Sequence, residues 1–241
     1  MGSPLIVSVI APCTGRKNWR GPSLNPAQLA LLHAGLLPDA DAWPRFPATE
    51  LYAGLGHLLL RRGIDAFRAG GSGRLDFHIV SAGMGVIEER TPIPPYEATF
   101  LTLRGRARRA WAAQLGIPRG IADVFAQRAD LRLVLLGREY LEVCALPAVT
   151  DGTPTIVLAA PSAADLVPPG ALHVPLQLTQ AKRFHATLIA LKGELVRRLL
   201  SDGALWRRSD VRHLPAWRDA RAFLDLCESC APAAAPPGDP R

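Results

Sequence analysis

The stretch that decides the fold reads Val80-Ser81-Ala82-Gly83-Met84-Gly85-Val86-Ile87, and it continues through Glu88-Glu89-Arg90-Thr91-Pro92-Ile93-Pro94-Pro95-Tyr96-Glu97. Residues 77–80 form a short apolar run that is typical of a buried strand. The glycines that follow permit a sharp turn and close approach to a ligand, and the prolines then hold the chain extended. Open α/β sheets bind ligands at loops that follow strand ends. We therefore interpret residues 81–97 as a rigid ligand-binding loop, with a structural connection as the alternative.

Other apolar runs extend this strand into a sheet of four or five strands. They cover residues 5–11, 131–136, 155–159 and, more weakly, 172–174. Helical patterns separate them at residues 25–34, 48–68, 97–115, 121–128, 179–200 and 217–230. Strands that alternate with helices predict a three-layer α/β/α fold with a mainly parallel sheet. Residues 5–11 are rich in Val and Ile, and we expect them to form its central strand.

The length of 241 residues suits one sizeable α/β domain, which we place at residues 1–230. Residues 231–241 are rich in Pro and Ala and predict a disordered tail. A hydrophobic fraction of 49% excludes wholesale disorder. No apolar run is long enough to span a bilayer, and no secretory signal pattern opens the chain, so we expect no membrane association.

Four cysteines are too few for a disulfide scaffold, which favours a reduced, cytoplasmic protein. Cys227 and Cys230 have the spacing of zinc ligands, but no second pair accompanies them. We therefore expect neither a metal nor another cofactor.

The net charge of +7 comes mostly from arginine. Arginine binds phosphate in a bidentate manner and stacks on bases, so this excess favours a nucleic-acid partner. A compositional bias of a GC-rich genome is the alternative, because Ala and Pro are also abundant.

Unusual polar residues gather in four loops and at one helix start. The loops cover residues 13–17, 50–54, 81–97 and 137–140, and the helix start covers residues 180–185, where Lys182 and His185 are spaced i, i+3. Because the carboxyl ends of parallel strands meet at one edge, we expect the loops to converge on a single pocket.

The order of these motifs resembles that of the peroxide-stress YaaA-like family and its small uncharacterised relatives. The matching segments are Pro12-Cys13-Thr14-Gly15-Arg16-Lys17, Leu51-Tyr52-Ala53-Gly54, Ser81-Ala82-Gly83-Met84-Gly85-Val86, Ile93-Pro94-Pro95-Tyr96-Glu97, Glu139-Tyr140 and the basic helix from Lys182. The resemblance spans residues 5 to about 200. It departs from the family at Arg90, where relatives usually carry an acid, and at Glu97, which replaces the commoner Asp. The lysine loop is also one residue longer than in some relatives.

The resemblance implies a nucleic-acid-linked role on an architecture similar to that of uracil-DNA glycosylases. Base excision needs a pocket for a flipped base, donors for the departing base anion and a carboxylate near the sugar. We therefore assign candidate catalytic roles to Lys17, Glu88, Glu89, Glu97 and Glu139. Candidate substrate-binding residues are Cys13, Thr14, Asn18, Tyr52, Ser81, Gly83, Met84, Tyr96, Tyr140, Lys182 and His185.

Each of these residues also has a structural interpretation. Lys17 can be a loop cation, Tyr96 can pack behind the prolines, and Glu139 can stabilise a helix N-terminus. His185 can be a core histidine, and Cys13 has no obvious histidine partner that would make it a nucleophile.

Three functional hypotheses follow. The first is a DNA glycosylase-like enzyme that excises a modified or damaged base, including a bulky foreign or phage base, from duplex DNA with a flipped base or from single-stranded DNA. The second is a base-modifying transferase, because the Cys-to-Lys loop also resembles one in archaeosine synthases. The third is a non-catalytic DNA-binding stress protein. None of them requires an obligatory protein partner.

Overall fold

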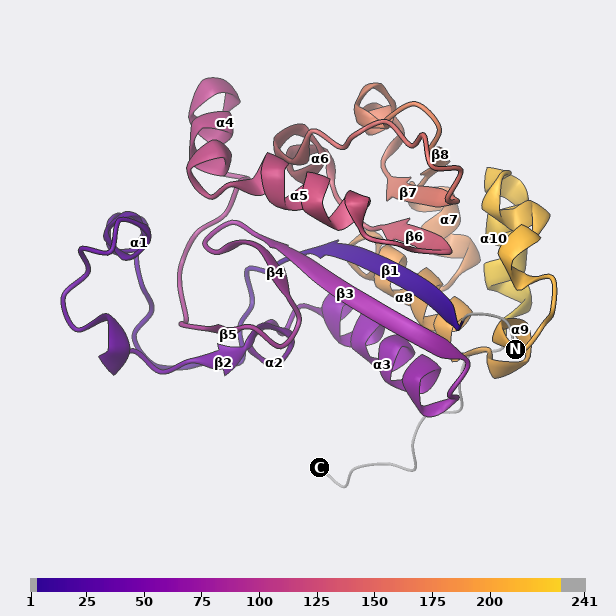
Figure 1. The fold of residues 1–241 in the computed structure, drawn as a ribbon, viewed down its shortest axis with the longest axis horizontal. Coiled ribbons are helices and arrows are strands. Elements are labelled where there is room, and N and C mark those ends of the chain that lie inside the picture. Colours follow the sequence, from indigo (N-terminus) through magenta and orange to yellow (C-terminus); the bar gives the residue numbers. More distant parts are fainter. Residues whose placement is uncertain (1–3, 231–241) are drawn as a thin grey trace.

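The computed structural model describes residues 4–230, and its centre is a mainly parallel sheet (Figure 1). Within those residues the main sheet has six strands in the order β4-β3-β1-β6-β7-β8. The strands are β1 (Leu5–Pro12), β3 (Gly73–Ser81), β4 (Gly85–Glu88), β6 (Leu131–Val134), β7 (Thr155–Ala159) and β8 (Leu172–Pro175). A second, two-stranded sheet joins β2 (Phe46–Pro47) to β5 (Pro92–Ile93). The predicted α/β class is therefore confirmed.

The expected count of four or five strands was wrong because β4 lies inside the stretch interpreted as a loop. Gly85 has a φ of 77°, a left-handed conformation that suits glycine, and the chain turns back there. β4 then pairs antiparallel with β3, from Ser81 opposite Gly85 to His78 opposite Glu88. The rest of the main sheet is parallel.

The central position of β1 is confirmed, since β3 and β6 flank it on either side in parallel register. The chain goes from β1 to β3 on one side of the sheet and later returns to β6 on the other. The carboxyl ends of β1 and β6 therefore bound a topological switch point, where open α/β sheets bind their ligands.

Helices lie on both faces of the sheet. They are α1 (Pro26–His33), α2 (Ala48–Leu51), α3 (Leu55–Ala69), α4 (Gly105–Gln114), α5 (Ile117–Ala126), α6 (Arg138–Cys144), α7 (Leu178–Arg183), α8 (Leu188–Ser201), α9 (Gly203–Trp206) and α10 (Ala220–Ser229). Short 3₁₀ turns are η1 (Ala40–Ala42), η2 (Pro161–Leu166), η3 (Val211–His213) and η4 (Pro215–Trp217). Helices α3, α8 and α10 cover one face, and α5 and α6 cover the other (Figure 1). Among the described helices, none is both long and apolar enough to cross a membrane.

Three predicted helices are interrupted, two of them where a residue pairs with a distant segment. The pattern at residues 48–68 breaks at Tyr52, which forms a bridge with Lys17 in the loop after β1. The pattern at residues 97–115 becomes helical only at Gly105, because Glu97 donates its backbone N–H to Leu24. The pattern at residues 179–200 divides into α7 and α8 around His185, whose φ is 53°. In contrast, α1 begins as expected after Asn25, with a capping box.

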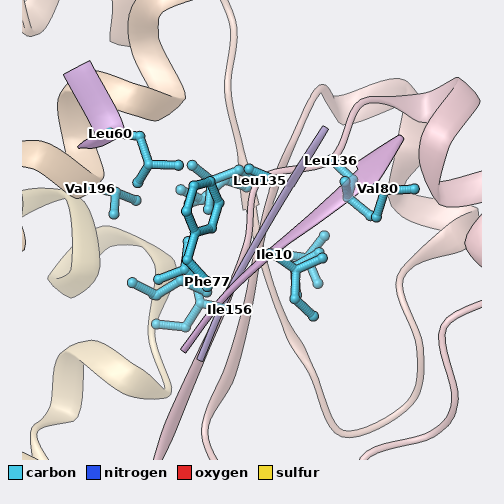
Figure 2. Close-up of a cluster of buried hydrophobic side chains, with 14 of the residues drawn as sticks. Ile10, Leu60, Phe77, Val80, Leu135, Leu136, Ile156 and Val196 are labelled. Carbon is cyan, nitrogen blue, oxygen red and sulfur yellow. The ribbon is translucent and has the colours of Figure 1, made fainter. Parts of the chain in front are cut away.

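The core lies on both sides of the sheet. Its buried side chains form one cluster, with members from Leu5 near one end of the described chain to Cys230 at the other. Figure 2 shows Phe77 of β3 meeting Leu60 of α3 and Val196 of α8 on one side of the strands. Ile10 and Val80 point to the other side, near Leu136 (Figure 2). The predicted tail at residues 231–241 lies outside the described residues.

Close packing between α3 and α8 depends on glycines. A Cβ atom added to Gly193 would lie 2.0 Å from the carbonyl oxygen of Gly56, and one added to Gly63 would lie 2.7 Å from Cα of Arg197. Two backbones this close leave no room for a side chain. The N-termini of both helices are consequently held together beside the ends of β1 and β6.

Candidate active site

A cavity of about 370 Å³ lies at the switch point between β1 and β6. Its walls come from the loop after β1, the first turn of α3, the end of β6 and the start of α8: Ala11, Pro12, Cys13, Thr14, Gly15, Arg16, Gly54, Leu55, Gly56, His57, Leu60, Leu135, Ile189, Lys192 and Gly193. A volume of this order is at the lower end of the range for small-molecule sites. We call it the switch-point cavity.

Lys192 projects from α8 into the wall of this cavity. Its Nζ donates hydrogen bonds to the carbonyl oxygens of Leu136, at 2.6 Å, and Leu135, at 3.2 Å, just beyond β6. Burial lowers the pKa of Lys192 to about 8, and the nearby charge of Glu139 opposes that shift. A substantial fraction of this amine is therefore neutral at mildly alkaline pH.

Lys192 also lines a second cavity, of about 510 Å³, which we call the outer cavity. The loops after β6, β7 and β8 surround it, and Glu139 belongs to its wall. Lys192 thus separates two hollows along the carboxyl edge of the sheet.

The sequence analysis did not single out Lys192, although the rarity of lysine in this chain was a signal that pointed to it. The chain has 28 basic residues apart from histidine, and only Lys17, Lys182 and Lys192 are lysines. Lys192 lies within the apolar pattern of the predicted helix at residues 179–200, outside the polar helix start at residues 180–185.

His57 is a second missed residue of the switch-point cavity. Its Nε2 lies 3.0 Å from the carbonyl oxygen of Thr49, which assigns the proton to that nitrogen. Nδ1 is buried without a hydrogen-bond partner among the described residues. Burial lowers the pKa of His57 to about 4, so the ring is neutral at physiological pH.

Thr14 fixes the loop after β1 against α3. Its Oγ1 accepts a hydrogen bond from the backbone N–H of Gly54 at 3.2 Å and donates one to the carbonyl of Arg16 at 2.7 Å. No side chain caps the start of α3 at Gly54. The residues of its first turn line the cavity, so their backbone N–H groups lie beside it. The guanidinium of Arg16 is exposed, and no ion pair occupies it among the described residues.

Three predicted residues form a buried hydroxyl cluster on the other side of β1. The hydroxyl of Tyr96 lies 2.7 Å from that of Tyr52 and 2.6 Å from Oγ of Ser81. Ser81 also accepts hydrogen bonds from the backbone N–H groups of Gly83 and Met84. All three side chains are 0% exposed, and burial raises the pKa of both tyrosines. In this arrangement their rings are enclosed and offer no face to a flipped base.

Cys13 connects that cluster to the switch-point cavity. Its Sγ lies 3.2 Å from the hydroxyl of Tyr140 and accepts a hydrogen bond from the backbone N–H of Ala82 at 3.4 Å. Burial raises the pKa of Tyr140. Cys13 is therefore tied to β3 and α6 while its side chain still lines the cavity.

Lys17 lies over the hydroxyl cluster, with Nζ 4.5 Å from the ring centroid of Tyr96. Burial lowers the pKa of Lys17, and the charges of Glu97 and Cys13 oppose this shift. Asn18 is exposed beside it, and its backbone N–H donates to Leu51. Lys17 and Glu97 thus form a charged rim above the buried tyrosines.

The expected convergence of the loops on a single pocket was wrong: residues 81–97 line neither cavity, and residues 137–139 line only the outer cavity. Two candidate catalytic residues, Glu88 and Glu89, lie away from both cavities. The turn at Gly85 carries β4 back along β3, so that Glu88 lies opposite His78, away from the carboxyl edge. Glu89 forms an ion pair with Arg68, in the last turn of α3. Glu97, beside Lys17, and Glu139, beside Lys192, remain at that edge.

Lys182 and His185 do not share a helix face, because α7 ends at Arg183. Both are exposed, and neither lines the switch-point or the outer cavity.

Arginines are concentrated at residues 104–109 and 197–212, the segments where we expect DNA to bind, and most of them are paired within the protein. Arg108 and Arg109 bind Glu142, while Arg197 and Arg198 bind Glu194. Arg212 pairs with Asp130, which also accepts from the backbone of Ile6 near the opposite edge of the sheet. That second segment is therefore separate from the two cavities.

No family model matches the chain, and no curated protein matches it. The YaaA-like resemblance therefore stays a prediction. Within residues 4–230, no group of three or more His, Cys, Asp or Glu side chains is placed to hold a metal ion.

Proposed function

We propose that the protein is a DNA glycosylase-like enzyme that releases a modified base from DNA, with the switch-point cavity as the pocket for the flipped base. The observation that carries this proposal is the cavity itself: a partly open, mostly apolar hollow at the switch point, with the amine of Lys192 in its wall. A mainly parallel sheet with its site at the carboxyl edge also suits the expected uracil-DNA-glycosylase-like architecture.

The departing base carries the negative charge that develops as the glycosidic bond breaks. Lys192 in its ammonium form donates a hydrogen bond or a proton to that base, and the N–H groups at the start of α3 add a favourable field. Apolar walls such as Leu60 and Leu135 exclude water and strengthen these interactions.

Glu139 is the carboxylate best placed for the sugar. It lies in the outer cavity on the far side of Lys192, and its charge acts on that amine. From there it stabilises positive charge on the sugar or orients the attacking water. Glu97 and Lys17 form a second charged pair at the rim, above Tyr96.

The test measures the bases that the protein releases from a panel of modified duplex and single-stranded DNAs, by mass spectrometry. Glu139→Gln should reduce release by about two orders of magnitude or more, while DNA affinity stays nearly unchanged. Glu88→Gln is the matched control, since Glu88 is exposed and lies away from the cavities. The proposal is overturned if no DNA yields a free base, or if both variants release it at the wild-type rate.

A further inference from the structure

Lys192 is the one lysine of the three in this chain that lines the two cavities. There are 25 arginines and three lysines, and two of those lysines, Lys17 and Lys192, are partly buried at the carboxyl edge of the sheet. Arginine cannot be deprotonated in proteins, whereas a lysine amine can lose its proton and become a nucleophile. A chain that supplies positive charge almost always with arginine thus has a titratable amine at its central cavity.

The hydrogen bonds of Lys192 suit the neutral amine. A neutral amine has two N–H bonds and one lone pair, and two carbonyl oxygens, of Leu135 and Leu136, accept from Nζ. Both N–H bonds are then satisfied, and the lone pair is left for an electrophile. Among the described residues no ion pair joins Nζ to a carboxylate, although Glu139 lies close enough to act on its charge.

We propose that Lys192 forms an imine with the C1′ carbon of an abasic sugar, which gives this site a lyase activity on abasic DNA. The inference rests on the proposed function for the placement of the sugar between the two cavities. It does not depend on which base is removed, because every excised base leaves the same sugar. The ammonium form that protonates the leaving base also becomes, by that transfer, the neutral amine that attacks.

The reaction balances without an oxidant or a cofactor. The amine adds to the C1′ aldehyde of the ring-opened sugar, an N–C1′ bond forms, and the carbonyl oxygen leaves as water. Loss of a proton from C2′ then expels the 3′ phosphate by breaking the C3′–O bond, and Glu139, which lines the outer cavity with Lys192, accepts that proton. Water hydrolyses the imine and returns Lys192 to the free amine.

The pH dependence should follow the amine. The titratable and charged groups that line the two cavities with Lys192 are Cys13, Arg16, His57, Arg138 and Glu139. His57 is neutral well above its lowered pKa, and the two arginines keep their charge. Adduct formation should therefore rise as the pH increases through about 8, where Lys192 deprotonates.

The experiment incubates the full chain with a duplex that contains one abasic site, in the presence of sodium borohydride. Borohydride reduces the imine to a stable amine, so a covalent protein–DNA complex accumulates on a denaturing gel. Lys192→Arg keeps the positive charge but loses the nucleophile, and it should trap less complex by about two orders of magnitude or more. Lys182→Arg is the matched control and should trap as the wild type does, since Lys182 is exposed and lines neither cavity.

Peptide mapping of the trapped complex decides the attachment point. A DNA remnant on Lys192, together with loss of trapping in a Lys192→Arg variant that melts like the wild type, supports the inference. Absence of wild-type trapping between pH 6 and 9, or attachment at Lys17 or at the N-terminal amine, overturns it.

The two proposals fail separately. Base release without any trapped complex would leave the glycosylase in place and remove the imine. Trapping at Lys192 without release of any base would keep the imine and restrict the protein to abasic sites.

Discussion

The two sides of β1 at the carboxyl edge of the sheet differ in what fills them. Between β1 and β3, Tyr52, Ser81 and Tyr96 hydrogen-bond to one another and are fully buried. Between β1 and β6, the space is open and contains Lys192 and His57 in its walls. The filled side is therefore a rigid support. The open side has the motif at residues 12–16 in one wall, and Lys192, which no quoted motif contains, in another.

A distinctive pattern of glycine and proline marks a backbone conformation that few residues can adopt. Such a segment need not be the place where chemistry occurs. Gly83 allows Tyr96 to approach closely, since a Cβ added there would lie 2.6 Å from its ring. That requirement is visible in sequence as glycine and proline. A lysine within a helix requires no special residues around it, so no comparable pattern in the sequence reveals its role.

The largest effect should follow Gly193→Ala, which tests whether the open side depends on the contact between α3 and α8. Because the new Cβ meets the backbone of Gly56 at 2.0 Å, two helices must separate. We expect a loss of about 3 kcal/mol or more in the free energy of unfolding. Chemical denaturation followed by circular dichroism measures it.

Gly15→Ala is the control, because it lies in the same cavity wall with nothing within 4 Å of the added Cβ. It should change stability by less than about 0.5 kcal/mol. Equal effects of the two substitutions would contradict the tight helix contact.

Acid should lower the free energy of unfolding through His57, which lies in the wall of the open side. Its pKa is lowered to about 4 in the folded protein from 6.5, so the unfolded state binds the proton more tightly. The stabilising contribution is present above pH 6.5 and is lost as the pH falls toward 4, with about 2 kcal/mol lost between pH 7 and pH 5.

His57→Phe removes this titration, and its unfolding free energy should decline less over that range than that of the wild type. Denaturation series at several pH values measure the two slopes. Parallel slopes would show that His57 is not held neutral in the folded protein.

Much of the fold was predictable, because it depends on local patterns. Apolar runs located β1 and β7 closely, and Asn25 located the start of α1. The interrupted helices could not be predicted, since Tyr52 and Glu97 pair with segments that are distant in sequence. Long-range backbone pairing overrides local helical propensity.

The candidate site was predictable in its place but not in its composition. Strand ends pointed to the carboxyl edge, and Cys13, Thr14 and Glu139 do lie at the two cavities. Glu88 and Glu89 were misplaced because the turn at Gly85 reverses the chain.

Ser81→Ala should have a moderate effect and tests the filled side. The substitution leaves the hydroxyls of Tyr52 and Tyr96 with only each other, and it removes the acceptor for Gly83 and Met84. Buried groups without partners should cost about 1.5 kcal/mol in unfolding free energy. Base release should change little if this side is only a support, so a large loss of activity with a small loss of stability would contradict the comparison.

The smallest effect should follow Arg16→Ala, which asks on which side of the molecule DNA binds. Arg16 is exposed at the mouth of the switch-point cavity, and among the described residues no salt bridge engages it. Its removal should leave stability within about 0.5 kcal/mol of the wild type. If its guanidinium contacts one phosphate, the slope of log affinity against log salt should become shallower by about 0.9, as fluorescence anisotropy at several salt concentrations would measure. Arg106→Ala is the control, because Arg106 is exposed on α4, within the arginine-rich segment at residues 104–109, and lines neither cavity. A shallower slope for Arg106→Ala with an unchanged slope for Arg16→Ala would move the DNA to α4.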